Sequence, residues 1–252
     1  MRVPAVLILL LGLCLGAQAP RHLTVAAAAD LKWALEEVRQ EFRQAQPAIQ
    51  VDLTFGASGL FYAQLTQKAP FDLFLSADLD YPRRLQEAGL ARGLFTYGRG
   101  RLALVVAPAS ALDPARLGLR TLLDPAVRHA ALANPAHAPF GRAARSALEA
   151  AGLWAELQPK VVLGENVSQA AQFVQSGAAE AGLVALSLTR APAAPWPAGR
   201  VWLVPAELHP PLDQGGAILA WAKDPGAAEA FRDFLLGPRG RAILARYCDP
   251  PK

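Results

Sequence analysis

The feature that most constrains this chain is a repeated junction, at which a short apolar strand passes directly into a helix through small or polar residues. Five junctions of this kind read AAAAD at 26–30, FGASG at 55–59, LSAD at 75–78, HAPFG at 137–141 and GENVS at 164–168. Strands that alternate with helices at this spacing are typical of an α/β protein, whose parallel sheets are flanked by helices. With 252 residues, 53% of them hydrophobic, the chain can bury the core of one large domain or two lobes.

The apolar periodicity predicts the individual elements. Strands are expected over 23–28, 51–55, 71–75, 102–107, 130–133, 161–163 and 217–221. Helices are expected over 31–42, 60–69, 81–90, 142–151, 168–176 and 227–247, the last interrupted at Gly237-Pro238.

The first 19 residues have the composition of a secretory signal peptide. One Arg precedes an apolar core too short to span a bilayer, and the segment ends on Ala17-Gln18-Ala19, the small-x-small pattern of a cleavage site. We therefore expect a protein exported to the periplasm or another extracytoplasmic compartment. Removal of the signal leaves Cys248 as a lone thiol, so no internal disulfide is expected. The net charge of +4 is spread along the chain and does not indicate nucleic-acid binding.

The five junctions favour an anion site. The first turn of a helix presents unpaired N–H groups and the positive end of the helix dipole, and in open α/β sheets ligands bind at this edge. Ser58 could donate from its hydroxyl and its N–H, or serve as an ordinary N-cap. Asp30 could also be an N-cap, whereas Ala77, Phe140 and Val167 could serve only through backbone N–H groups.

Catalytic and metal-binding patterns are missing. The four His residues are scattered, and Gly56-Ala57-Ser58-Gly59-Leu60 lacks the second Gly of a hydrolase elbow. No phosphate-loop or dinucleotide fingerprint occurs either. We therefore expect a binding protein that is not an enzyme and that needs no cofactor or protein-coordinated metal.

Six motifs taken together, AAAADLKWAL, TFGASGLFYAQL, APFDLFLSAD, ANPAHAPFGRAA, GENVSQAAQFV and GAAEAGLV, resemble the periplasmic molybdate-binding proteins of ABC importers over residues 23–247. The resemblance implies a two-lobed periplasmic-binding fold of type II, with a ligand cleft between the lobes. The expected lobes are 20–98 plus 207–252 and 99–206. The resemblance also implies a molybdate or tungstate ligand and a membrane permease as partner. We expect the protein to be a monomer.

Carried onto this chain, the resemblance assigns the anion to Ser58, Ala77, Phe140 and Val167. Two positions depart from the family pattern: Asp30 stands where many relatives have a donor Ser, and Ala185 stands where some have a donor Tyr. Three residues next to the matched turns, Asn166, Ser168 and Ser187, are candidates to replace the lost donors.

The departures leave alternatives open, because an ionised Asp and a deprotonated oxyanion can both only accept hydrogen bonds. Asp30 could cap its own helix, or accept the proton of hydrogen phosphate or arsenate. With Glu165 or Asp78 it could instead bind a metal cation. A further rival is an enzyme on the same scaffold that uses Asp30 or Glu165 as a base.

Overall fold

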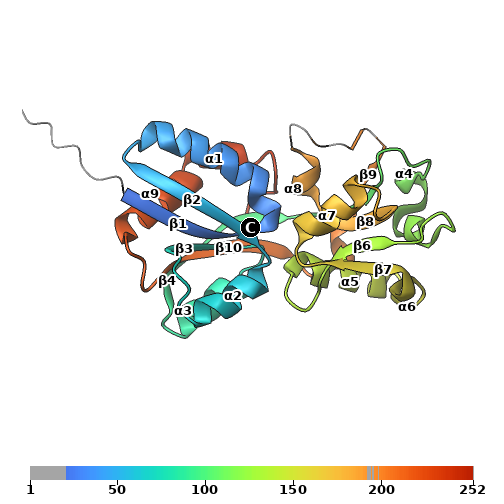
Figure 1. The fold of residues 1–252 in the computed structure, drawn as a ribbon, viewed down its shortest axis with the longest axis horizontal. Helices are drawn as coiled ribbons and strands as arrows, with labels where there is room; N and C mark the ends of the chain where they lie inside the picture. Colours follow the sequence, from blue (N-terminus) through green and yellow to red (C-terminus); the bar gives the residue numbers. More distant parts are fainter. Residues whose placement is uncertain (1–20, 192–193, 195, 198, 252) are drawn as a thin grey trace, which may run out of the picture.

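The computed structural model describes residues 21–251, except 192, 193, 195 and 198. The predicted signal peptide at 1–19 lies outside the described residues. Two five-stranded sheets lie side by side along the long axis of the molecule, each with helices packed against it (Figure 1). We call each sheet with its helices a lobe, the first containing β1 and the second containing β5. Within the described residues, no helix is long and apolar enough to cross a membrane.

The first sheet has the strand order β2-β1-β3-β10-β4. Its strands are β1 (Arg21–Ala28), β2 (Ile49–Gly56), β3 (Leu73–Ser76), β4 (Ala91–Gly100) and β10 (Leu212–Leu219). The second sheet has the order β7-β6-β8-β5-β9. Its strands are β5 (Leu102–Val106), β6 (Ala130–Ala133), β7 (Val161–Gly164), β8 (Ala181–Ala185) and β9 (Val201–Leu203).

Helices cover both sheets. In the first lobe they are η1 (Ala29–Leu31), α1 (Lys32–Ala45), α2 (Ser58–Thr66), α3 (Asp80–Glu87), α9 (Pro225–Leu236) and α10 (Pro238–Leu244). In the second lobe they are α4 (Pro114–Leu117), η2 (Gly118–Leu123), α5 (Pro139–Ala150), α6 (Trp154–Leu157), η3 (Gln158–Lys160), α7 (Val167–Gln175) and α8 (Leu186–Thr189). A short helix, η4 (Ala206–Leu208), lies on the return to the first sheet. In Figure 1 the first sheet lies between α1 and α9 on one side and α2 and α3 on the other.

The prediction of parallel sheets is correct for only part of each sheet, because each sheet is mixed. β1 pairs in parallel with β2 and β3, but β10 runs antiparallel to both β3 and β4. In the second sheet β6 is parallel to β7 and β8, whereas β5 is antiparallel to β8 and β9. The antiparallel strands are those next to the passages between the sheets, where no crossover helix imposes a parallel direction.

The sequence patterns also missed β4 entirely and placed three helix starts too late. β4 contains two Arg residues and three Gly residues, which hide its alternation. The helices expected from 60, 142 and 168 begin at Ser58, Pro139 and Val167. Pro139 has the backbone angle of a first helical residue, and Asn166 accepts a hydrogen bond from the N–H of Gln169, so both helices start at the junction itself.

The chain passes between the sheets twice. Arg101 alone separates β4 from β5, and the return runs from β9 to β10 through η4. The C-terminal segment lies beside the first passage, where Asp249 pairs with Arg101 at 3.0 Å and bridges to the backbone of Arg99. The predicted lobe limits of 20–98 plus 207–252 and 99–206 stay a prediction, while the sheets themselves change at Arg101 and between Leu203 and Leu212.

Candidate anion-binding site

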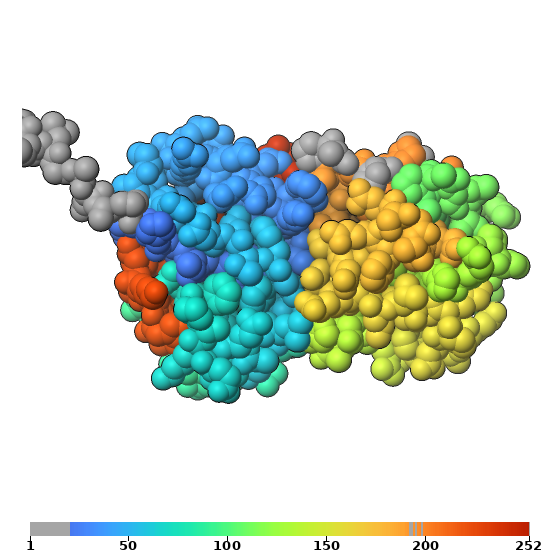
Figure 2. All heavy atoms as spheres, viewed as in Figure 1, coloured from blue at the N-terminus to red at the C-terminus, as the bar shows by residue number. Residues whose placement is uncertain are grey.

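A small cavity lies where the two lobes meet, with a volume of about 10 Å³. All five junctions of the sequence supply its walls. It is lined by Ala28, Ala29, Asp30, Gly56, Ala57, Ser58, Ala77, Ala138, Pro139, Phe140, Asn166 and Val167. The structure therefore brings together the five residues predicted as ligand contacts, although they are spread over more than half of the chain. Figure 2 shows the two lobes in contact along this boundary.

Three helices begin at the cavity. Ser58 and Val167 are the first residues of α2 and α7, and Phe140 is the second residue of α5. N–H groups in a first helical turn have no partner within the helix, and the helix dipole adds positive potential there. Three helix N-termini on one small cavity make a binding place for an anion that needs no Lys or Arg.

Ser58 is the buried hydroxyl of the cavity, with 1% of its surface exposed. Its predicted alternative role as an N-cap is wrong, because Ala57 is the N-cap residue and no side chain caps α2. The Ser58 hydroxyl oxygen instead accepts a hydrogen bond from the Ala77 N–H at 3.0 Å. A hydroxyl that accepts one bond still has its proton to donate, so Ala77 orients Ser58 toward a role as donor. Direct contact of the Ala77 N–H with a ligand stays a prediction.

Asp30 lies in η1 and is 3% exposed. The cap interpretation of Asp30 is also wrong, since neither η1 nor α1 has a side-chain cap. Its Oδ2 accepts a hydrogen bond from Gln214 Nε2 at 2.5 Å, and its buried Oδ1 has no partner among the described residues. Burial raises the pKa of Asp30 from 3.8 to about 6, and the hydrogen bond from Gln214 opposes this rise. Sequence reasoning missed Gln214, because the contact joins residues 184 positions apart.

The proposed replacement donors bind protein groups. Asn166 lines the cavity, but its side-chain oxygen caps α7. The Ser187 hydroxyl donates to the Asp30 carbonyl at 2.7 Å, and the Ser168 hydroxyl donates to the Ala29 carbonyl at 3.3 Å. Both serines thus belong to the second lobe and hold η1 of the first. Ala185 is buried in β8 and is not among the lining residues.

Further contacts join the lobes beside the cavity. The Gly59 N–H donates to the His137 carbonyl at 2.9 Å. Arg142 Nη2 donates to Asp78 Oδ2 at 2.5 Å, and Arg142 Nη1 donates to the Tyr81 hydroxyl at 3.2 Å. Burial raises the pKa of Asp78, and the charge of Arg142 opposes this rise. These bonds hold the lobes in a closed arrangement.

Comparison with known proteins places the chain in a family. Residues 23–247 match the family model described as "Bacterial extracellular solute-binding protein". The chain is a bacterial extracellular solute-binding protein. It is 36% identical to the molybdate-binding protein ModA of Rhodobacter capsulatus, over 96% of this chain and 92% of the relative. The solved Azotobacter vinelandii periplasmic molybdate-binding protein superposes with a TM-score of 0.85 and 32% identity, over 91% of this chain and 100% of that one.

These matches confirm the predicted family and the two-lobed fold of this solute-binding protein. They give no support to the alternatives of a cation site or a catalytic base. Within the described part of the chain, Asp30, Asp78 and Glu165 do not form a group able to hold a metal ion. Glu165 is exposed and does not line the cavity, so it is not placed to act as a base there.

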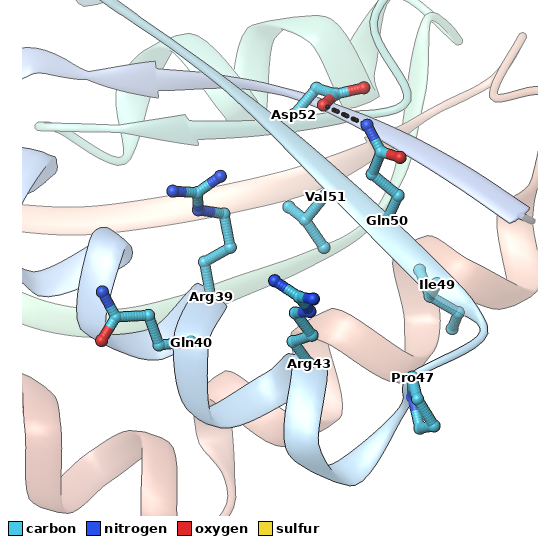
Figure 3. Close-up of a pocket in the computed structure, with 8 residues that line it drawn as sticks. All are labelled: Arg39, Gln40, Arg43, Pro47, Ile49, Gln50, Val51 and Asp52. Atoms are coloured by element: carbon cyan, nitrogen blue, oxygen red, sulfur yellow. Dashed lines mark hydrogen bonds between the residues drawn. The ribbon is translucent and has the colours of Figure 1, made fainter.

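A larger pocket of the solute-binding protein lies away from the contact between the lobes, on the outer side of α1 and β2 (Figure 3). It is lined by Arg39, Gln40, Arg43, Pro47, Ile49, Gln50, Val51 and Asp52. None of the predicted ligand residues belongs to it. The Gln50 amide donates to Asp52 at 3.1 Å inside it, and Arg39 pairs with Glu36, so three of its polar side chains already have protein partners.

Proposed function

We propose that this solute-binding protein captures molybdate or tungstate in the cavity between its lobes and delivers it to the membrane permease of an ABC importer. The observation that carries the proposal is the convergence of three helix N-termini and the Ser58 hydroxyl on one buried cavity. The relatives that match along almost the whole chain are named as molybdate-binding proteins, which supports the same ligand class here.

The chemistry of the lining supports an oxyanion. A fully deprotonated tetrahedral oxyanion has only acceptors, so every favourable contact must come from a donor. The cavity offers backbone N–H groups and one hydroxyl, and its lining contains no Lys or Arg. Neutral donors at helix ends suit an anion that must also be released again, since they add no full opposite charge that would have to be left unpaired.

The cellular location and the oligomeric state of the protein are part of the same proposal. We infer that the segment at 1–19 directs export and is removed, and that the mature chain works outside the cytoplasmic membrane as a monomer without a cofactor. N-terminal sequencing of the secreted protein and its mass in solution check these two points. Cleavage after Ala19 and the mass of a single chain are expected.

Thermal melting of the purified mature protein tests the ligand. Molybdate, tungstate, sulfate, hydrogen phosphate, arsenate and a divalent cation are added in separate arms at equal concentration. A ligand that binds only the native state stabilises it by RT ln(1 + [L]/Kd), which is about 4 kcal/mol at 1,000 times Kd. Molybdate and tungstate are expected to give a large rise in melting temperature, and the other four a small one or none.

A rise in melting temperature with another ligand would contradict the assignment of molybdate or tungstate. If hydrogen phosphate, arsenate or the cation raises the melting temperature and molybdate and tungstate do not, the ligand assignment is wrong. Calorimetric titration of the best ligand then gives its stoichiometry, and one anion per chain is expected because the proposed donors converge on one cavity.

A further inference from the structure

Asp30 is an anomaly in a cavity built for an anion. It lines the cavity together with Ser58, Phe140 and Val167, all of which present donors. An ionised carboxylate presents only acceptors, and it adds a negative charge next to a doubly negative ligand. The same carboxyl group becomes a donor once it carries a proton.

The geometry distinguishes the two oxygens of Asp30. Oδ2 is held by Gln214 Nε2 at 2.5 Å, and an amide nitrogen can only donate, so Oδ2 is the acceptor. Oδ1 is buried and has no partner among the described residues. Gln214 is itself fully buried in β10, and a side chain at Gly100 would clash with Phe140 and crowd Gln214. The carboxyl group is therefore held in place. Oδ2 already accepts a hydrogen bond, so Oδ1 is the oxygen that could carry a proton and donate it to a ligand.

Among the titratable groups around Asp30, Asp30 itself is the one expected to change its charge near neutral pH. Tyr97 of β4 is buried, which raises its pKa well above its ordinary value, and its hydroxyl donates to the Ser76 carbonyl. Cys248, beyond α10, has its pKa raised to about 12 by burial. Asp78 is paired with Arg142. From α8 only the Ser187 hydroxyl faces Asp30, and no Lys, Arg or His in the described part of the chain pairs with Asp30.

We propose that Asp30 couples anion capture to proton uptake: in the complex its carboxyl group carries a proton on Oδ1 and donates it to an oxygen of the bound anion, while Gln214 positions Oδ2. The proton comes from solvent, and no covalent bond of the anion changes. This inference rests on the proposed function, and it makes Asp30 the residue that sets the pH range of capture. Since the pKa of Asp30 is about 6 in the closed arrangement without an anion, most molecules are expected to take up the proton as they bind at higher pH.

Calorimetric titration with molybdate in buffers of different ionisation enthalpy measures the number of protons taken up. About one proton per anion is expected at pH 8, and about none at pH 5, where Asp30 is already protonated. Above pH 6 the affinity is expected to fall by about tenfold for each pH unit.

Asp30→Asn provides the decisive variant, because its amide can accept from Gln214 and donate to the anion at every pH. It is expected to bind molybdate without proton uptake and with an affinity independent of pH. At pH 8 it is expected to bind roughly 100-fold more tightly than the natural protein, and at pH 5 equally well. Glu165→Gln, which removes an exposed carboxylate in the junction at 164–168, is the matched control and is expected to keep the proton uptake.

Gln214→Leu tests the positioning role through the pH profile. The hydrogen bond from Gln214 favours the ionised form of Asp30, so its loss is expected to shift the fall in affinity to higher pH. An unchanged profile in this variant would remove Gln214 from the mechanism.

The two proposals fail in different ways. If molybdate and tungstate do not bind at all, the proposed function is wrong and the coupling falls with it. If they bind to the natural protein with the same apparent enthalpy in every buffer at pH 8, the function stands and the coupling is overturned. Loss of binding in Asp30→Asn at both pH 5 and pH 8, with a normal melting temperature, also overturns it.

Discussion

The two lobes contribute to the cavity in different ways. The first lobe places two polar side chains there, Ser58 and Asp30, and each is fixed by a second group of the same lobe, Ala77 or Gln214. The second lobe contributes the helix starts at Phe140 and Val167, whose side chains are apolar, and its Asn166 caps a helix. If the proposed function holds, we expect discrimination by side-chain chemistry to reside in the first lobe, and the second lobe to supply backbone donors only when the lobes close.

Gly59→Leu tests whether the donors of the second lobe act only after closure. A Cβ atom at Gly59 would lie 2.6 Å from both the His137 carbonyl and the Tyr81 hydroxyl. Keeping the lobes apart removes the hydrogen bonds from Phe140 and Val167, at about 1.5–3 kcal/mol each for a charged acceptor, so molybdate affinity is expected to fall roughly 1,000-fold. Calorimetric titration measures this loss.

The control for Gly59→Leu is Ala63→Leu, an exposed position on the same helix. Both variants are expected to melt close to the natural protein in the absence of ligand. The clash with the His137 backbone arises only in the closed arrangement, and the Tyr81 hydroxyl, in the same lobe as Gly59, is the far end of a side chain that can shift. Natural affinity in Gly59→Leu would show that binding does not need the second lobe.

Asp30→Asn measures how much the burial of the Asp30 carboxylate lowers the free energy of unfolding. The folded-state pKa of about 6 lies above the ordinary value of 3.8, so the stabilisation that Asp30 provides when protonated is lost as the pH rises through this window. Without ligand, the variant is expected to match the natural protein at pH 4 and to exceed its free energy of unfolding by roughly 3 kcal/mol at pH 8. Urea unfolding at both pH values checks this, and a difference that does not change with pH would refute it.

Ser58→Ala and Val167→Ala compare one cavity residue from each lobe. Ser58→Ala removes a side-chain donor and leaves the Ala77 N–H unpaired, so molybdate affinity is expected to fall roughly 10–100-fold. Val167→Ala keeps the backbone N–H, and a change of less than about threefold is expected. Equal losses in the two variants, measured by calorimetric titration, would contradict the division between side-chain and backbone recognition.

Arg142→Ala tests the ion pair that joins the lobes at the edge of the cavity. The Arg142 side chain is 43% exposed, so its pair with Asp78 is expected to contribute no more than about 1 kcal/mol to closure, or a fivefold loss of affinity. Arg145→Ala on the same helix removes a pair with Glu149 that stays within α5, and no loss is expected. Similar affinities of the two variants would mean that the Arg142 pair does not contribute to capture.

Local chemistry explains which parts of the site could be predicted from sequence. Ser58 can be singled out from its own short stretch, because a polar residue between small ones at a strand-to-helix junction depends on a few adjacent residues. Phe140 and Val167 follow only from the resemblance to the family, because their apolar side chains carry no local signal of a role. The same approach failed for Gln214 and for the role of Ser187, since their partners in η1 lie 184 and 157 positions away. β4 was missed for a similar reason, because Gly98 is required by Cys248, whose sulfur would lie 2.5 Å from an added Cβ.

The position of β10 has a consequence for how the protein assembles. β10 inserts between β3 and β4, so residues 212–219 complete a sheet whose other strands all lie within the first hundred residues. The second sheet is continuous in the chain from 102 to 203 and can pair all its strands first. Until β10 arrives, β3 and β4 expose unpaired edges, which are the surfaces most open to wrong pairing. During synthesis and export, the lobe that begins the chain is thus the last to be finished, and its exposed edges are where a chaperone would be needed.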